Sequence, residues 1–123
     1  MSHHLNEVQH IDDRMQECIA VCSDCHDICR ATMQHSVQMG GDYAAPEHNR
    51  ALVVCADICD TCRDVMLAGS KLHVLTCGVC AEACTRCADS CEALAGDDEV
   101  IQRCAEICRR CAELCRQMAG SVA

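Results

Sequence analysis

Aromatic residues are almost absent from this sequence. Its 123 residues include no Phe, no Trp and one Tyr. A domain of this length normally fills its core with aromatic rings and branched aliphatic chains, so other side chains must occupy that space here. The length suits one compact domain with one core. We therefore expect residues 1–123 to form a single domain whose core has an unusual composition.

Signals for export and membrane insertion are also missing. The first residues, MSHHLNEVQHIDD, are polar and mildly acidic, with no basic n-region, no twin arginine and no apolar run. No stretch approaches the roughly 20 apolar residues that a membrane span requires. We therefore expect a cytoplasmic protein without a membrane partner, in a compartment that keeps thiols reduced.

Positive charge is scarce. The chain has 10 Lys and Arg against 19 Asp and Glu, which gives a net charge of −9. Nucleic acids and anionic membrane surfaces favour basic patches, so neither is expected as a partner. The sequence also lacks an activated nucleophile, a paired acid and base, and a phosphate loop. We do not expect an enzyme.

Sulfur is what the sequence has in excess. There are 16 Cys and 6 Met, and they take positions that bulky hydrocarbon side chains fill elsewhere. The same number of cysteines predicts disulfides outside the cell and metal or redox chemistry inside it. In a reducing cytosol the thiols are expected to be free.

The cysteine-rich segments repeat every three or four residues, and nothing alternates with a period of two, so helices are expected and strands are not. Gly40-Gly41 and Gly96 suit helix ends, Pro46 suits a first turn, and the carboxylates of Asp97 and Asp98 can cap a helix N-terminus. The sequence therefore predicts an all-α protein, an up-down-up-down four-helix bundle with a cysteine-lined core. The expected helices cover approximately residues 5–39, 46–68, 71–95 and 98–118.

A twelve-residue unit recurs, with cysteines spaced four, three and four residues apart. It appears as CIAVCSDCHDIC, CAEACTRCADSC and CAEICRRCAELC, starting at Cys18, Cys80 and Cys104. The second expected helix carries CADICDTCRDVM, in which Met66 stands where a fourth cysteine would be. Four copies of one pattern indicate one shared purpose. The cysteines are Cys18, Cys22, Cys25, Cys29, Cys55, Cys59, Cys62, Cys77, Cys80, Cys84, Cys87, Cys91, Cys104, Cys108, Cys111 and Cys115.

This spacing places all sixteen thiols on the inward faces of the helices, because residues three and four apart share one helix face. Cysteine acting only as a small buried hydrophobe would leave voids in such a core. Disulfides within one helix would be strained, although bridges between helices remain possible in an oxidised sample. Metal ions would fill the voids and use every thiol.

Softness and charge favour Cu(I) among the candidate metals. Cu(I) is soft and fits sites with two or three sulfur ligands. Four zinc ions among sixteen thiolates would leave a charge of about −8, whereas one Cu(I) per thiolate leaves none. We therefore expect clusters with bridging thiolates and a capacity nearer sixteen ions than eight. A zinc reservoir and an iron–sulfur electron carrier remain alternatives, although iron–sulfur clusters usually take cysteines from loops.

The repeated CxxxCxxCxxxC units on four successive expected helices, within Met15 to Met118, resemble those of the bacterial copper storage proteins, in particular the cytosolic branch. The resemblance implies a four-helix bundle that stores and buffers many Cu(I) ions along its core, usually as a homotetramer. A storage protein of this kind would release copper to a copper chaperone or a small thiol ligand. Met66, in place of one cysteine of the repeat, is a departure that affects the exact capacity.

Antiparallel helices would gather thioethers and an imidazole at one end of the bundle. These groups bind Cu(I) without losing a thiol proton, so we expect this end to be the entry for copper. The opposite end is expected to be largely hydrocarbon. The expected entry residues are Met15, Met66, His73 and Met118, and the opposite end receives Met33, Leu52, Leu94 and Ile101.

Overall fold

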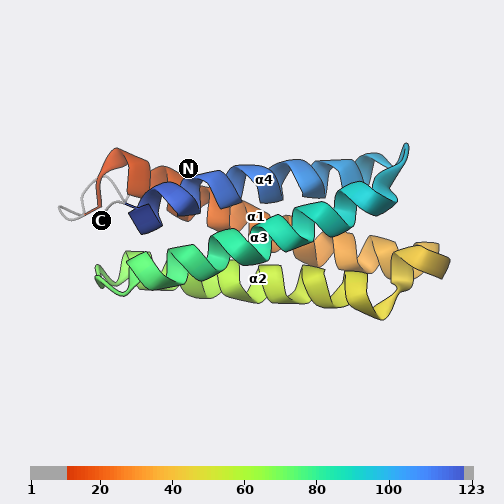
Figure 1. Ribbon diagram of the computed structural model, residues 1–123, viewed down its shortest axis with the longest axis horizontal. Coiled ribbons are helices and arrows are strands. Elements are labelled where there is room, and N and C mark those ends of the chain that lie inside the picture. Colours follow the sequence, from red (N-terminus) through yellow and green to blue (C-terminus); the bar gives the residue numbers. More distant parts are fainter. Residues whose placement is uncertain (1–10, 121–123) are drawn as a thin grey trace.

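The computed structural model describes residues 11–120, and these form an antiparallel four-helix bundle (Figure 1). No strand occurs within this range. The structure therefore confirms the predicted fold class, and none of its helices is long and apolar enough to cross a membrane. The elements are α1 (Asp13–Met39), the short 3₁₀ helix η2 (Gly41–Ala44), α2 (Pro46–Leu67), α3 (His73–Ala95) and α4 (Glu99–Gly120).

The first helix begins later than expected. Asp12 caps α1, because its carboxylate accepts a hydrogen bond of 2.8 Å from the backbone N–H of Met15. Residues 11 and 12 are not helical, which corrects the expected start near residue 5, and residues 5–10 lie outside the described range. At the other end, Gly40 has a positive φ of 71°, which glycine adopts without steric cost and which turns the chain out of the helix.

The remaining helix bounds differ from the expected ones by one or two residues. Residues 71 and 72 form a turn before α3, in which the Ser70 hydroxyl accepts a hydrogen bond from the Leu72 backbone N–H. Asp98 caps α4 by accepting from the Ile101 backbone N–H at 2.9 Å, so this helix begins at Glu99. It continues to Gly120, two residues beyond the expected end.

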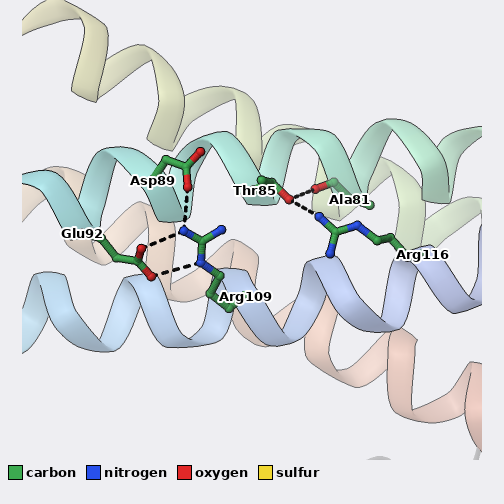
Figure 2. Close-up of polar contacts among 6 residues, drawn as sticks. All are labelled: Ala81, Thr85, Asp89, Glu92, Arg109 and Arg116. Carbon is green, nitrogen blue, oxygen red and sulfur yellow. Dashed lines mark hydrogen bonds and ion pairs between the residues drawn. The ribbon is translucent and has the colours of Figure 1, made fainter.

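Ion pairs cross three of the four contacts between neighbouring helices. Arg109 of α4 reaches Asp89 at 2.6 Å and Glu92 at 2.7 Å on α3 (Figure 2). Arg30 pairs with an α2 carboxylate, Asp57, and Arg110 pairs with an α1 carboxylate, Glu17. Within residues 11–120 no ion pair joins α2 to α3. All these side chains are exposed, so the pairs orient neighbouring helices more than they stabilise the fold.

Candidate metal centre

All sixteen cysteine side chains lie inside the bundle. Each is buried with 0% of its surface exposed, and each is a free thiol. Small side chains such as Ala56, Ala88 and Ala112 are buried with them. The core is therefore a row of sulfur atoms enclosed by four helices, as the cysteine spacing predicted.

The sulfur atoms form a network of close contacts between different helices. The Sγ atoms of Cys55 and Cys84 lie 3.6 Å apart, and those of Cys22 and Cys111 lie 3.7 Å apart. The contacts within one helix are at the long end of the range, with 4.0 Å between Cys80 and Cys84. Two ligands at these separations can both reach one metal ion, because metal–thiolate bonds are about 2.3 Å long.

Five groups of four thiols could each hold a metal ion. Within each group all Sγ atoms lie within 4.8 Å of one another, and every member is buried. We call these groups the thiol ladder. In order along the bundle they are Cys22, Cys80, Cys111 and Cys115; Cys59, Cys80, Cys84 and Cys111; Cys25, Cys55, Cys59 and Cys84; Cys25, Cys29, Cys55 and Cys108; and Cys29, Cys87, Cys104 and Cys108.

Consecutive groups of the thiol ladder share two thiols. The first and second groups share Cys80 and Cys111, and the second and third share Cys59 and Cys84. The third and fourth groups, and the fourth and fifth, also share two thiols each. Twelve cysteines therefore make five overlapping sites. A thiolate in such a position can bridge two metal ions. The geometry therefore favours a continuous cluster over separate mononuclear sites.

Four cysteines lie outside the thiol ladder. Cys18, Cys62 and Cys77 are at the end of the bundle where α1 and α3 begin, and Cys91 is at the opposite end. Cys18 still contacts Cys115 at 3.7 Å. Cys62 and Cys77 contact each other at 3.4 Å, which is the shortest sulfur–sulfur distance among the contacts in the core.

Burial and hydrogen bonding set the protonation of these thiols. A hydrogen bond with Cys111 raises the pKa of the Cys59 thiol, and one with Cys104 raises the pKa of Cys108. The hydrogen bond with Cys108 lowers the pKa of Cys25, although burial opposes this shift. A metal ion that binds Cys59 or Cys108 must therefore displace a proton, because the raised pKa keeps each of these thiols protonated.

The four expected entry residues are at one end of the bundle, where α1 and α3 begin and α2 and α4 end (Figure 1). Met66 and Met118 are buried, and Met15 packs against the core while partly exposed. His73 is partly exposed, and its Nδ1 atom is buried without a hydrogen-bond partner. The His73 imidazole therefore has a nitrogen with a free lone pair or proton at this end of the bundle.

The opposite end differs in part from the expectation. Leu52 and Ile101 are fully buried and close the row of sulfurs with hydrocarbon. Met33 and Leu94 are only partly buried, because Thr32 and Ala95 take the inward positions beside them. On α1 the next inward residue after Cys29 is Thr32, three residues later, and not Met33, four residues later.

A buried histidine at this end was missed in the sequence analysis. His48 is 2% exposed, with Nδ1 at 2.7 Å from the Ser90 hydroxyl and Nε2 at 3.3 Å from the Ser36 hydroxyl. These contacts join three helices, and burial lowers the pKa of His48, so its imidazole is neutral. Its position seven residues before Cys55, on the same helix face, is the signal that could have found it.

The fold and the row of buried free thiols define a thiolate metal-binding four-helix bundle. A family profile described as copper storage protein matches residues 11–120. The chain belongs to this family.

Solved structures agree with this assignment. A protein of Nitrosospira multiformis is 43% identical, with a TM-score of 0.81 over 88% of this chain and 96% of that one. The Cu(I)-bound copper storage protein BsCsp3 is 30% identical, with a TM-score of 0.80 over 88% of this chain and 100% of that one. Apo copper storage protein 3 of Bacillus subtilis is 31% identical, with a TM-score of 0.74 over 84% and 96% of the two chains. No curated protein matches the chain.

Proposed function

We propose that this chain stores and buffers Cu(I) by thiolate coordination along the axis of the bundle, with all sixteen cysteines as ligands. The observation that carries the proposal is the thiol ladder, in which each four-thiol group shares two members with the next. Family membership identifies copper as the cargo. We propose no catalytic role, because storage needs binding and release only.

The shared thiols favour a monovalent ion. Two ions in neighbouring groups would lie within about 3 Å of each other, since both bind the same two thiolates at about 2.3 Å. At that distance the repulsion between two divalent ions is four times that between two monovalent ions. Cu(I) is also softer than Zn²⁺ and accepts fewer than four sulfur ligands. A filled ladder is therefore better suited to Cu(I) than to zinc.

An anaerobic titration with Cu(I) tests this proposal. Metal-free protein with all thiols reduced is titrated against a Cu(I) chelator, and bound copper and thiols are counted per chain. Charge balance between thiolates and Cu(I) predicts saturation near sixteen ions. Saturation at eight or fewer would contradict it. Zinc in equal excess should not displace the bound copper, and an absence of brown colour would argue against an iron–sulfur cluster.

We also propose that copper enters at the end that carries Met15, Met66, His73 and Met118. The buried Nδ1 of His73 without a partner supports this role, and the hydrocarbon layer of Leu52 and Ile101 makes the opposite end a poor route for an ion. Replacing the three methionines by Leu and His73 by Ala should slow copper uptake in stopped-flow measurements while leaving the saturation value within about two ions. The matched control is Met33→Leu, at the other end.

The family resemblance suggests a homotetramer, and we propose that the contact between α2 and α3 supplies a face for assembly of identical chains. A groove there is lined by Ile58, Thr61, Leu72, Leu75, Thr76 and Val79. Leu75 is 67% exposed and Val79 is 55% exposed. Exposed apolar side chains that adjoin one another often mark a surface that binds another protein.

Charge supports a second copy as the occupant of this face. Beside the groove, a second hollow between the same two helices is lined by Glu47, Arg50 and Arg86, and Arg86 pairs with Glu82, so the charges at this place balance. Two copies of a chain with a net charge of −9 can therefore meet here with little repulsion. Light scattering after size exclusion should give the mass of an oligomer for the wild type and a smaller mass for Leu75→Lys. Leu75→Ile is the control, and a monomeric wild type would contradict the proposal.

We place storage in the cytoplasm, with a copper chaperone or a small thiol as the acceptor of released Cu(I). The sixteen free thiols support this location, because an oxidising compartment would convert closely spaced cysteines to disulfides. Fractionation of cells should recover the protein in the cytosolic fraction, and transfer of Cu(I) to a small thiol should be measurable by dialysis.

A further inference from the structure

One cysteine pair differs from all others in the core. The Sγ atoms of Cys62 and Cys77 are 3.4 Å apart, whereas the other sulfur–sulfur contacts measure 3.6 to 4.0 Å. Both residues lie outside the thiol ladder, so neither belongs to a four-thiol group. The two thiols come from neighbouring helices, α2 and α3, and not from one helix.

The pair also lies near the end of the bundle. Cys62 is five residues before the end of α2 at Leu67, and Cys77 is four residues after the start of α3 at His73. The two helices are joined by residues 68–72, a short turn in which Gly69 has a φ of 69°. Helix ends open more readily than helix centres, so small molecules can reach this buried pair more easily than pairs in the middle of the bundle.

The geometry permits a bond between these two sulfurs. A disulfide needs an S–S distance of about 2.05 Å, so each sulfur must move by less than about 1 Å. Rotation of the two side chains can supply such a shift, because the thiols face each other across a helix contact. Pairs such as Cys80 and Cys84 on one helix lack this freedom, since their backbone positions are fixed by the helix.

We propose that Cys62 and Cys77 are a modification site at which a small-molecule disulfide, such as oxidised glutathione, converts the pair to a reversible cystine. One protein thiolate attacks the small disulfide, forms a mixed disulfide and releases one small thiol. The second protein thiolate attacks the mixed disulfide and releases another small thiol. The two protein cysteines lose two electrons and two protons, which the two small thiols gain.

The modification has a consequence for copper that rests on the proposed function. A cystine cannot act as a thiolate ligand, so the chain loses two ligands next to the expected entry residues Met66 and His73. Oxidised protein should therefore load copper more slowly and bind about two ions fewer, since charge balance assigns one Cu(I) to each thiolate. Reduction restores both properties. The pair would connect copper uptake to the redox state of the cell.

The test starts with the full chain, free of metal and oxygen, incubated with oxidised glutathione and analysed by mass spectrometry over time. The first product should have lost about two mass units, with no retained glutathione, and dithiothreitol should reverse the change. Trypsin leaves Cys62 in the same peptide as Cys59, and Cys77 in the same peptide as Cys80, so fragment ions must assign the bond.

Cys59 and Cys80 form the matched control, because they join the same two helices at 3.7 Å but belong to the thiol ladder. Cys62→Ser should slow formation of the first disulfide at least tenfold, and Cys59→Ser should leave its rate within about twofold. A first bond between other cysteines, or equal effects of the two variants, would overturn the proposal. This assay contains no copper, so a negative result would contradict the proposed disulfide without affecting copper storage. Copper storage is tested separately by the saturation value of the Cu(I) titration.

Discussion

Cys80 and Cys111, on α3 and α4, belong together to two different four-thiol groups, and their Sγ atoms lie within 4.8 Å of each other. Both thiols of this pair therefore belong to two candidate metal sites at once. A loss of either thiol should disturb both sites, whereas a loss of a thiol outside the ladder should disturb none of the five. This difference can be measured.

We expect Cys111→Ser to reduce copper capacity more than Cys91→Ser. Cys111 belongs to two groups of the thiol ladder, and Cys91 belongs to none. Charge balance predicts a loss of about one Cu(I) for either variant. Cys111→Ser should also weaken the binding of a second ion, because a bridge serves two ions, so its loss should be nearer about two. Saturation values from anaerobic titration compare the variants, and circular dichroism checks that both remain helical. Equal losses would argue against shared ligands.

Acid should weaken copper binding. Hydrogen bonding to Cys111 and burial raise the pKa of Cys59, so this thiol is protonated at neutral pH before metal enters. Each proton displaced by Cu(I) makes binding more favourable as pH rises and less favourable as pH falls. A chelator at fixed concentration should therefore remove more copper at pH 5 than at pH 8. The amount of protons released on loading, measured in weak buffer, should approach the number of thiolates formed.

Alkaline pH should destabilise the metal-free protein. Cys59 and Cys108 have pKa values raised in the folded state above the ordinary value of 9.0. Above pH 9 these thiols ionise in the unfolded chain but stay protonated in the folded one, so stability is present below that pH and is lost as pH rises. Urea midpoints of metal-free protein should fall as pH rises above about 9, where thiols with lowered pKa, such as Cys25, are ionised in both states and add no further change. Copper-loaded protein, whose thiolates are already deprotonated, should show a smaller change.

His48 should stabilise the fold without contributing to copper capacity. His48→Ala leaves a cavity and removes hydrogen-bond partners of Ser36 and Ser90. We expect a loss of about 2–4 kcal/mol in the free energy of unfolding. Copper saturation should remain unchanged, since no four-thiol group includes His48. Ser36→Ala is the milder control, and a lower copper capacity in a folded His48→Ala protein would assign this residue to the metal site instead.

The sequence predicted the bundle and the inward thiols because both depend on spacing within one helix. Cys18, Cys22, Cys25 and Cys29 must share a face on any α-helix, and the same holds for the other units. Met66 is buried at the position of the missing cysteine for the same reason. The sequence also placed the expected entry residues at one end, since that follows from antiparallel order alone.

Bridging thiolates were expected from charge balance, but the particular thiols that neighbouring groups share could not be predicted, because this depends on how far each helix is shifted along the axis relative to its neighbours. The spacing on α3 does not determine which α4 thiol lies beside Cys80. The start of α1 was wrong because the cap at Asp12 was overlooked. His48 was missed because a buried imidazole needs hydroxyl groups from other helices, here Ser36 and Ser90, and these partners are distant in sequence.

The overlap of neighbouring four-thiol groups affects movement as well as capacity. An ion bound by Cys80 and Cys111 in the group that contains Cys22 would already hold two ligands of the next group. Under the proposed function, such an ion would advance by replacing its remaining sulfur ligand while it keeps these two, so it would stay bound to sulfur at every step. The same thiols that we propose to bind copper would then also form its path, and a single entry site would be enough to fill and empty the ladder from Cys22 to Cys104.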